Sequence, residues 1–208
     1  MGESGQQQQQ PGPAPKRLLP RAQRRAQIID AARRSFARNG FAATSMEDLA
    51  AGSGVTKMII YRHFAAKADL YRAVLDDVSG RLDSSVLKAG RWPANIEALV
   101  TFADTDPDGF VLLYEHAARE PEFREHADAA RATGLAMAQE QLREFLPDPG
   151  RREWAAQLLP RVVIQTILAW LAAGRPGTIA ATSATLRTLT GEVARAIAAH
   201  DTIPDPTR

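Results

Sequence analysis

Apolar residues recur at helical spacing along almost the whole of this 208-residue chain, and this periodicity constrains the fold more than any other feature. No stretch shows the sustained two-residue alternation, rich in β-branched residues, that is typical of strands. Pro93, Pro107, Pro121 and Pro149 stand near the starts of helical stretches, where the missing N–H of proline does no harm. The pattern therefore predicts an all-α protein of roughly nine helices.

The ends of the expected helices are marked by capping residues, glycines and prolines. Thr44 and Glu47 match a capping box, in which each side chain bonds the backbone N–H of the other residue. Gly40 is the expected stop of the first helix, and Gly52, Ser53 and Gly54 predict a tight turn between two short helices. The expected helices span residues 20–39, 44–51, 55–63, 67–88, 93–104, 107–118, 121–146, 150–173 and 178–199.

The formal net charge is only +2, but the charges are unevenly distributed. Residues 16–72 contain twelve Lys or Arg and four Asp or Glu, whereas residues 73–208 contain fourteen and nineteen. A basic first part suits a polyanion such as DNA, which would repel the acidic remainder. We therefore expect two parts with different partners.

The composition also limits the location and chemistry of the protein. Residues 1–18 combine a Gln run with Pro and Gly and predict a disordered tail, and residues 202–208 predict a flexible C-terminus. The chain shows neither an export signal nor about 18 unbroken apolar residues, so we expect a soluble cytoplasmic protein with no membrane partner. The absence of cysteine excludes disulfides, thiolate zinc sites and cysteine nucleophiles.

Two short helices joined by a glycine turn match the plan of a helix-turn-helix. Leu49, Val55, Ile60 and Phe64 fall at spacings that pack these helices against the first one. This packing leaves six residues, both polar and apolar, on the outer face: Thr56, Lys57, Met58, Ile59, Tyr61 and His63. In a major groove Met58 and Ile59 would contact thymine methyl groups, and Lys57 would reach a guanine edge or a phosphate.

Residues 24–41, RRAQIIDAARRSFARNGF, and residues 44–75, TSMEDLAAGSGVTKMIIYRHFAAKADLYRAVL, resemble the DNA-binding domain of the TetR family of bacterial transcriptional regulators. The matching positions are Phe36, Gly40, Phe41, Thr44, Leu49, Ala50, Gly54, Val55, Ile60, Tyr61, His63, Phe64, Lys67 and Leu70. The resemblance implies a sequence-specific regulator, associated with the bacterial nucleoid, that binds a double-stranded operator, expected to be an inverted repeat. Met58 departs from the glycine or proline more usual in the family, which leaves the operator sequence open.

The resemblance implies that Thr44, Tyr61, His63 and Lys67 contact phosphates, although a capping role for Thr44 and packing roles for Tyr61 and His63 remain open. The complete set expected to bind DNA is Thr44, Ser45, Thr56, Lys57, Met58, Ile59, Tyr61, His63 and Lys67. A basic lead-in precedes and begins the first helix, formed by Lys16, Arg17, Arg21, Arg24 and Arg25. It either enters a minor groove or adds affinity by counterion release, and we favour the second.

Residues 19–66 are thus the expected DNA-binding domain and residues 67–201 the expected effector-binding and dimerisation domain. A single recognition helix reads few base pairs, so we expect a homodimer, formed through residues 150–173 and 178–199. The resemblance implies a repressor released by a small, largely apolar effector of unknown identity; a regulator without an effector is the alternative. The candidate effector-binding residues are Phe102, Phe110, Tyr114, His116, Met137, Trp154, Gln165 and Thr166.

Other functions are weaker. The four histidines lie far apart, and His116 with Glu120, like Glu122 with His126, is more consistent with a surface ion pair than with a metal site in a metal-dependent enzyme. We expect no catalytic residues, cofactor or metal. The sequence DTDPDGFVLLYE at 104–115 fits a calcium-loop pattern, but Asp106 followed by Pro107 predicts a helix start, which excludes the loop.

Overall fold

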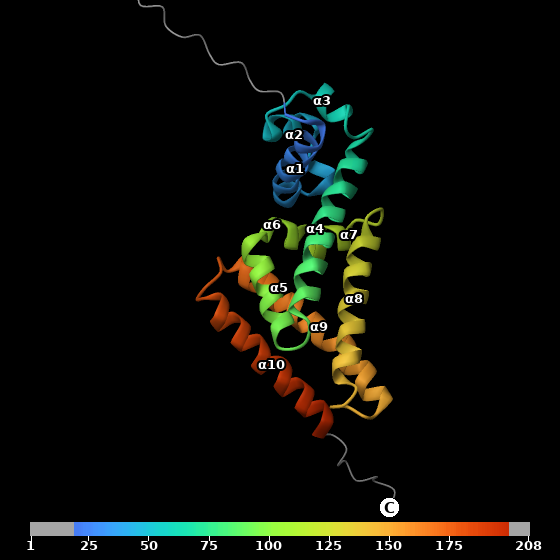
Figure 1. The fold of residues 1–208 in the computed structure, drawn as a ribbon, viewed down its shortest axis with the longest axis vertical. Coiled ribbons are helices and arrows are strands. Elements are labelled where there is room, and N and C mark those ends of the chain that lie inside the picture. The colour runs from blue at the N-terminus through green and yellow to red at the C-terminus, as the bar shows by residue number, and fades with distance from the viewer. Residues whose placement is uncertain (1–18, 200–208) are drawn as a thin grey trace, which may run out of the picture.

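A computed structural model describes residues 19–199, and within this range every regular element is helical (Figure 1). The predicted tail at 1–18 and the end of the chain at 202–208 lie outside the described residues. The elements are α1 (Arg21–Ala43), α2 (Met46–Ser53), α3 (Lys57–Tyr61), α4 (Lys67–Ala89), α5 (Ala94–Thr105), α6 (Pro107–Val111), the π-helical turn η1 (Leu112–His116), α7 (Ala117–Arg119), α8 (Arg124–Leu142), α9 (Pro149–Ala172) and α10 (Ile179–Ala199). The all-α prediction is confirmed.

Helices α1, α2 and α3 form a small unit at one end of the molecule (Figure 1). Ile28 and Phe36 of α1 are fully buried, as are Leu49 of α2 and Ile60 of α3 to within 1%. Gly40 interrupts α1 with a φ of 75°, a left-handed value that glycine adopts without a steric penalty. The break lies where the sequence predicted the end of the first helix.

The cap of α2 differs from the prediction by one residue. Ser45, not Thr44, is the N-cap, and its hydroxyl accepts a hydrogen bond from the N–H of Asp48 at 3.1 Å. The Asp48 carboxylate accepts one in return from the Ser45 N–H at 2.9 Å. Thr44 and Glu47 carry the same residue pattern, but the Thr44 side chain is buried and faces α1 instead. The predicted Thr44–Glu47 capping box is therefore wrong.

Helix α4 runs from the small unit deep into the second domain (Figure 1). Its buried side chains contact α1 at one end and α5 farther along, and include Leu70, Val74, Val78 and Leu82. At its start the Asp69 carboxylate accepts a hydrogen bond from the Ala66 N–H at 3.1 Å. Because one continuous helix serves both domains, a displacement of α4 moves the small unit.

The segment predicted as one helix over 107–118 contains a π-helical turn, η1. The wider turn buries Leu112, Leu113 and Tyr114 in succession, which the spacing of an α-helix does not predict. The Tyr114 ring packs on that of Phe110, with centroids 4.8 Å apart. Both residues lie in the interior, on the side of the second domain that meets α1 and α4.

Helices α8, α9 and α10 complete the second domain. Helix α8 packs against α9, and α10 packs against α9 and α5. Among the described helices α9 alone is long and apolar enough to cross a membrane by those two criteria, yet only 28% of its most apolar 18-residue window is buried. In this fold α9 packs on α8 and α10, and much of its remaining apolar surface is exposed.

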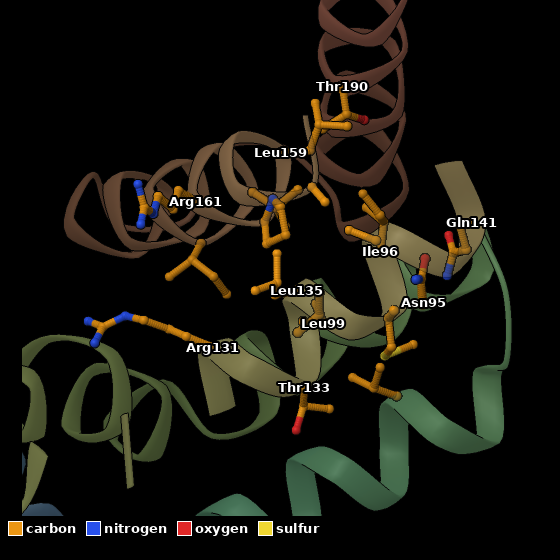
Figure 2. A pocket seen from close by; sticks show the side chains of 18 of the residues that line it. Asn95, Ile96, Leu99, Arg131, Thr133, Leu135, Gln141, Leu159, Arg161 and Thr190 are labelled. Atoms are coloured by element: carbon orange, nitrogen blue, oxygen red, sulfur yellow. The ribbon is translucent and has the colours of Figure 1, made fainter. Parts of the chain in front are cut away.

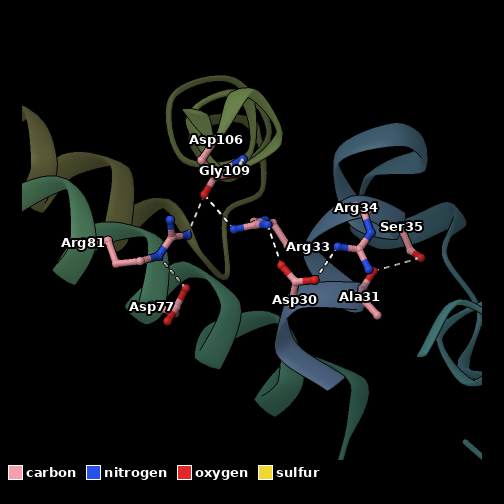
Figure 3. A network of polar contacts seen from close by, with 9 residues as sticks. All are labelled: Asp30, Ala31, Arg33, Arg34, Ser35, Asp77, Arg81, Asp106 and Gly109. Atoms are coloured by element: carbon pink, nitrogen blue, oxygen red, sulfur yellow. Dashed lines mark hydrogen bonds and ion pairs between the residues drawn. The ribbon is translucent and has the colours of Figure 1, made fainter. Parts of the chain in front are cut away.

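The Asp106 carboxylate joins three helices (Figure 3). It caps α6 by accepting the Gly109 N–H at 2.9 Å, as the Asp106–Pro107 sequence predicted. It also accepts hydrogen bonds from Arg33 of α1 at 2.8 Å and from Arg81 of α4 at 2.5 Å. Only 4% of the Asp106 side chain is exposed, so the charge of this carboxylate is poorly screened by solvent. The small unit is thereby fixed to the second domain.

We expect Asp106→Asn to lower the free energy of unfolding by about 2 kcal/mol, because the amide retains the cap but loses two charge-assisted hydrogen bonds. Urea denaturation monitored by circular dichroism measures the change. Asp148→Asn is the matched control, since Asp148 caps α9 through the Arg151 N–H and Asn caps as well as Asp. A loss for Asp106→Asn no larger than for the control would show that the two arginines contribute nothing.

Candidate functional site

The exposed face of α3 carries the residues expected to read bases. Thr56 caps this helix by accepting the Ile59 N–H at 3.4 Å. The Met58 side chain is 74% exposed and that of Tyr61 is 52% exposed, whereas Ile60 between them is fully buried. Ile59 is half-buried and packs against the core, so it projects less than the sequence predicted. An exposed methionine beside an exposed tyrosine has no role in folding.

A cluster of basic side chains lies beside this face. His63 follows α3, and its pKa is lowered, chiefly by partial desolvation and then by the positive charges of Arg21, Arg62, Arg25 and Arg24. The Arg25 guanidinium lies 5.0 Å from the centroid of the Phe64 ring, which holds the start of α1 near the end of α3. The cluster supplies positive charge next to Met58 and Tyr61. Sequence reasoning missed Arg62, although it stands between Tyr61 and His63.

Lys57 forms an ion pair with Glu47 of α2. The hydrogen bond between them raises the pKa of Lys57 and lowers that of Glu47. Both side chains are at least half exposed, and such pairs are weak in water. Lys57 can therefore exchange Glu47 for a phosphate or a base edge at little cost.

Two residues expected to contact phosphates face inward. The Thr44 hydroxyl donates to the Gly40 carbonyl at 2.7 Å, and 1% of the residue is exposed. The Lys67 ammonium donates to the carbonyls of Phe41 and Thr44 at 2.8 and 2.9 Å and, more weakly, to that of Ala42. Its three protons are thus used. In this structure Thr44 and Lys67 position α2 and α4, and their side chains are not free to bind phosphate.

The second domain encloses a cavity of about 740 Å³ between α4, α5, α8, α9 and α10. Of the residues predicted to bind an effector, Tyr114, Met137 and Gln165 line it. Phe102 and Phe110 are buried in the core, the His116 ring contacts the kink of α1 at Gly40, and the Trp154 side chain is 58% exposed. Thr166 donates to the Val162 carbonyl at 2.7 Å. These five residues do not line the cavity, so their prediction as lining residues is wrong.

Most of the cavity wall is formed by residues that the sequence did not single out. Figure 2 shows several polar ones among them, including Asn95 and Gln141 on one side and Arg131 and Arg161 on another. Aliphatic side chains supply much of the rest, including Leu82, Val86, Ile96, Leu99, Leu135, Leu159, Val163 and Ile164. Burial raises the pKa of the Tyr114 hydroxyl, with a smaller contribution from the charge of Asp83, so it remains protonated. A largely apolar wall with a few polar groups is typical of a small-molecule site.

One of the two His and Glu pairs considered for a metal, Glu122 with His126, has other partners. Glu122 accepts a hydrogen bond from Arg72 of α4 at 2.5 Å, and His126 lies 3.1 Å from Asp76 of the same helix. The expected ion pair between Glu122 and His126 is therefore replaced by two contacts to α4. Within residues 19–199 no three His, Asp or Glu side chains are grouped in a way that could hold a metal ion.

A three-helix unit with an exposed reading helix, followed by a helical domain around a cavity, defines a helix-turn-helix protein with a second, ligand-sized site. Residues 28–74 match the family model described as bacterial regulatory proteins, tetR family. The chain is 36% identical over 106 residues to the transcriptional activator FasR of Mycolicibacterium smegmatis, a match covering 47% of this chain and 48% of that protein. It thus spans about half the length of this curated relative.

Solved structures agree in fold. A TetR-like transcriptional regulator from Rhodococcus sp. RHA1 is 22% identical, with a TM-score of 0.75, over 88% of this chain and all of that one. The regulator FadR from Bacillus subtilis, in complex with stearoyl-CoA, is 19% identical, with a TM-score of 0.63, over 79% of this chain and 96% of that one. The match to the TetR family of bacterial regulatory proteins thus covers the helix-turn-helix unit and the first part of α4, and the fold is shared along most of the chain.

We expect Met58→Ala to change which DNA sequence the protein prefers, because an exposed side chain on α3 is removed without loss of packing. Tyr61→Phe should instead lower affinity for all sequences alike, by about 1 kcal/mol, through loss of one phosphate contact. Selection of bound sequences from a random DNA pool separates the two effects. An unchanged preference for Met58→Ala would eliminate Met58 as a reader of bases.

Proposed function

We propose that this protein is a sequence-specific DNA-binding transcriptional regulator of the bacterial cytoplasm, without enzymatic activity. The observation that carries the proposal is the α3 face, where exposed Met58 and Tyr61 stand beside the cluster of Arg21, Arg24, Arg25 and Arg62. Phosphate contacts from the cluster would set the register on the duplex, and Met58 with Lys57 would read base edges. Tyr61, His63, Ser45 and Thr56 complete the proposed interface.

We further propose that the protein binds an inverted repeat as a homodimer. One short helix reads too few base pairs to specify a single site in a genome, whereas two copies separated by about one helical turn of DNA do so. The exposed apolar surface of α9, together with Trp154 and with Leu189 of α10, supports an interface through these two helices. Two helices from each copy would form a four-helix bundle.

The cavity supports regulation by a small effector rather than constitutive binding. It is bordered by α4, which also packs against α1, so an occupant that moves α4 would alter the distance between the two α3 helices of a dimer. We propose that the effector relieves repression. FasR is named as an activator, so the direct test of whether this protein represses or activates transcription is the expression of a reporter gene with and without it.

Selection of genomic fragments by the purified protein, followed by footprinting, tests the DNA-binding proposal. We expect protection of an inverted repeat of roughly 15 to 30 base pairs. Protection that depends on salt but not on sequence would contradict the proposal, because contacts to the DNA phosphates alone give binding of that kind.

We expect Leu189→Glu to convert the dimer to a monomer and to weaken binding to an inverted repeat at least tenfold, because it places a charge in an apolar interface. Sedimentation velocity measures the first effect and fluorescence anisotropy the second. Leu87→Glu on α4 is the control, since Leu87 is 66% exposed and belongs to neither interface helix. A Leu189→Glu protein that remains dimeric would exclude this face of α10 from the interface.

A further inference from the structure

The cavity has a distinct polar group on each side of its apolar wall. On one side, the Asn95 side-chain oxygen is buried and has no hydrogen-bond partner among the described residues. Its neighbour Gln141 is already occupied, because its side-chain oxygen accepts the Trp92 N–H at 3.2 Å. A buried polar atom without a partner is costly, and Asn95 lines the cavity, so an occupant with a hydroxyl group could satisfy it.

On the other side, positive charge is available (Figure 2). Arg131 and Arg195 line the cavity but are paired with Asp128 and Glu192, at 3.0 and 2.6 Å. Arg161 has no ion-pair or hydrogen-bond partner within the described part of the chain. The charged residues that line the cavity are three arginines and the two acids Asp83 and Asp128. Because Arg131 and Arg195 are already paired, Arg161, which is exposed, is the lining arginine left to pair with an anionic group.

The wall between the two sides suits a flexible hydrocarbon chain. It is mainly aliphatic, with three aromatic residues, and Pro160 of α9 lies against Gly134 of α8, where a side chain at 134 would meet the proline ring at 3.6 Å. Pro160 also lacks an N–H, which leaves the Ala156 carbonyl without its usual helical donor. A volume of about 740 Å³ is within the usual range for sites that bind small molecules, and its polar groups on opposite sides suit a ligand that spans the cavity.

We propose that the effector is an elongated amphiphile with one anionic group at Arg161 and a hydroxyl group at the far end of an apolar chain, where it bonds Asn95. A long-chain hydroxycarboxylate is the simplest compound of this class. This inference rests on the proposed function for its regulatory meaning, but ligand binding can be measured on the protein alone. It assigns a chemical class to the cavity and a separate role to each of its two polar sides.

Titration calorimetry of the full chain with four probes of equal chain length tests the proposal. The probes are a carboxylate with a terminal hydroxyl, the plain carboxylate, the primary alcohol and the quaternary ammonium, each below its micelle concentration. We expect the hydroxycarboxylate to bind most tightly and the plain carboxylate about tenfold more weakly. The alcohol should bind more weakly again and the ammonium not at all. Ammonium or alcohol binding as tight as that of the plain carboxylate would overturn the anionic assignment.

Two variants separate the two sides. Arg161→Gln should weaken both carboxylates about tenfold and leave the alcohol unchanged, whereas Asn95→Leu should remove the advantage of the hydroxycarboxylate over the plain carboxylate. Arg119→Gln is the control, because Arg119 is 72% exposed and does not line the cavity. An equal effect of Arg161→Gln on all probes would overturn the proposal.

Operator binding is measured independently of these titrations. If no probe binds while the protein still protects a specific inverted repeat, the effector class is wrong and the proposed function stands. If the probes bind in the expected order but no specific DNA is protected, the proposed function fails while the ligand assignment stands.

Discussion

The position of the reading helix depends on one buried carboxylate. Asp106 sits where α1, α4 and α6 meet, and it accepts hydrogen bonds from Arg33, Arg81 and the Gly109 N–H. A side chain at position 109 would come within 2.5 Å of this carboxylate, so glycine is needed for the cap to close. Because poorly solvated charges are hard to leave unpaired, the three helices are held in one arrangement. Because α3 packs on α2 and α2 packs on α1, the orientation of the α3 face depends on how Asp106 holds α1.

The same junction lies close to the elements that surround the cavity. Helix α4 provides Arg81 to Asp106 and, one residue farther along, Leu82 to the cavity wall. The π-helical turn η1 provides Tyr114 to the cavity and His116 to the kink of α1, where a side chain at Gly40 would meet the His116 ring at 3.7 Å. Two elements therefore connect the cavity with the DNA-binding unit, namely α4 and η1. In each of them the residue that lines the cavity is one or two positions away from the residue that faces the DNA-binding unit or the Asp106 junction.

The DNA-binding unit could be predicted closely from sequence because its signals are local. The turn at Gly54, the inward positions of Leu49, Ile60 and Phe64, and the outward positions of Met58 and Tyr61 follow from spacing alone. The one-residue error at the α2 cap has a physical cause. Thr44–Glu47 and Ser45–Asp48 match the capping pattern equally well, and only the tertiary contact of Thr44 with Gly40 decides between them. Lys67 likewise finds its carbonyl partners only in the folded chain.

The cavity could not be predicted in the same way. Phe102 and Phe110 were expected to line it, but in this fold both are buried in the core away from the cavity, whereas Trp92, Tyr114 and Phe145 line it. Gly134 and Pro160 line the cavity where α8 and α9 approach each other closely, and helical periodicity does not distinguish a filled face from an empty one. Asn95 and Arg161 could be identified as candidate ligand contacts only in the folded structure, where the Asn95 side-chain oxygen and the Arg161 guanidinium have no partner among the described residues.

The most direct test of the role of the Asp106 junction compares the affinity of the native protein and of Asp106→Asn for an inverted repeat and for one half-site of it. Fluorescence anisotropy is measured at a temperature where both proteins are fully folded. If the junction fixes the spacing of the two α3 helices, Asp106→Asn weakens binding to the inverted repeat and leaves binding to the half-site unchanged. An equal loss on both DNAs, or no loss on either, would contradict that role for Asp106.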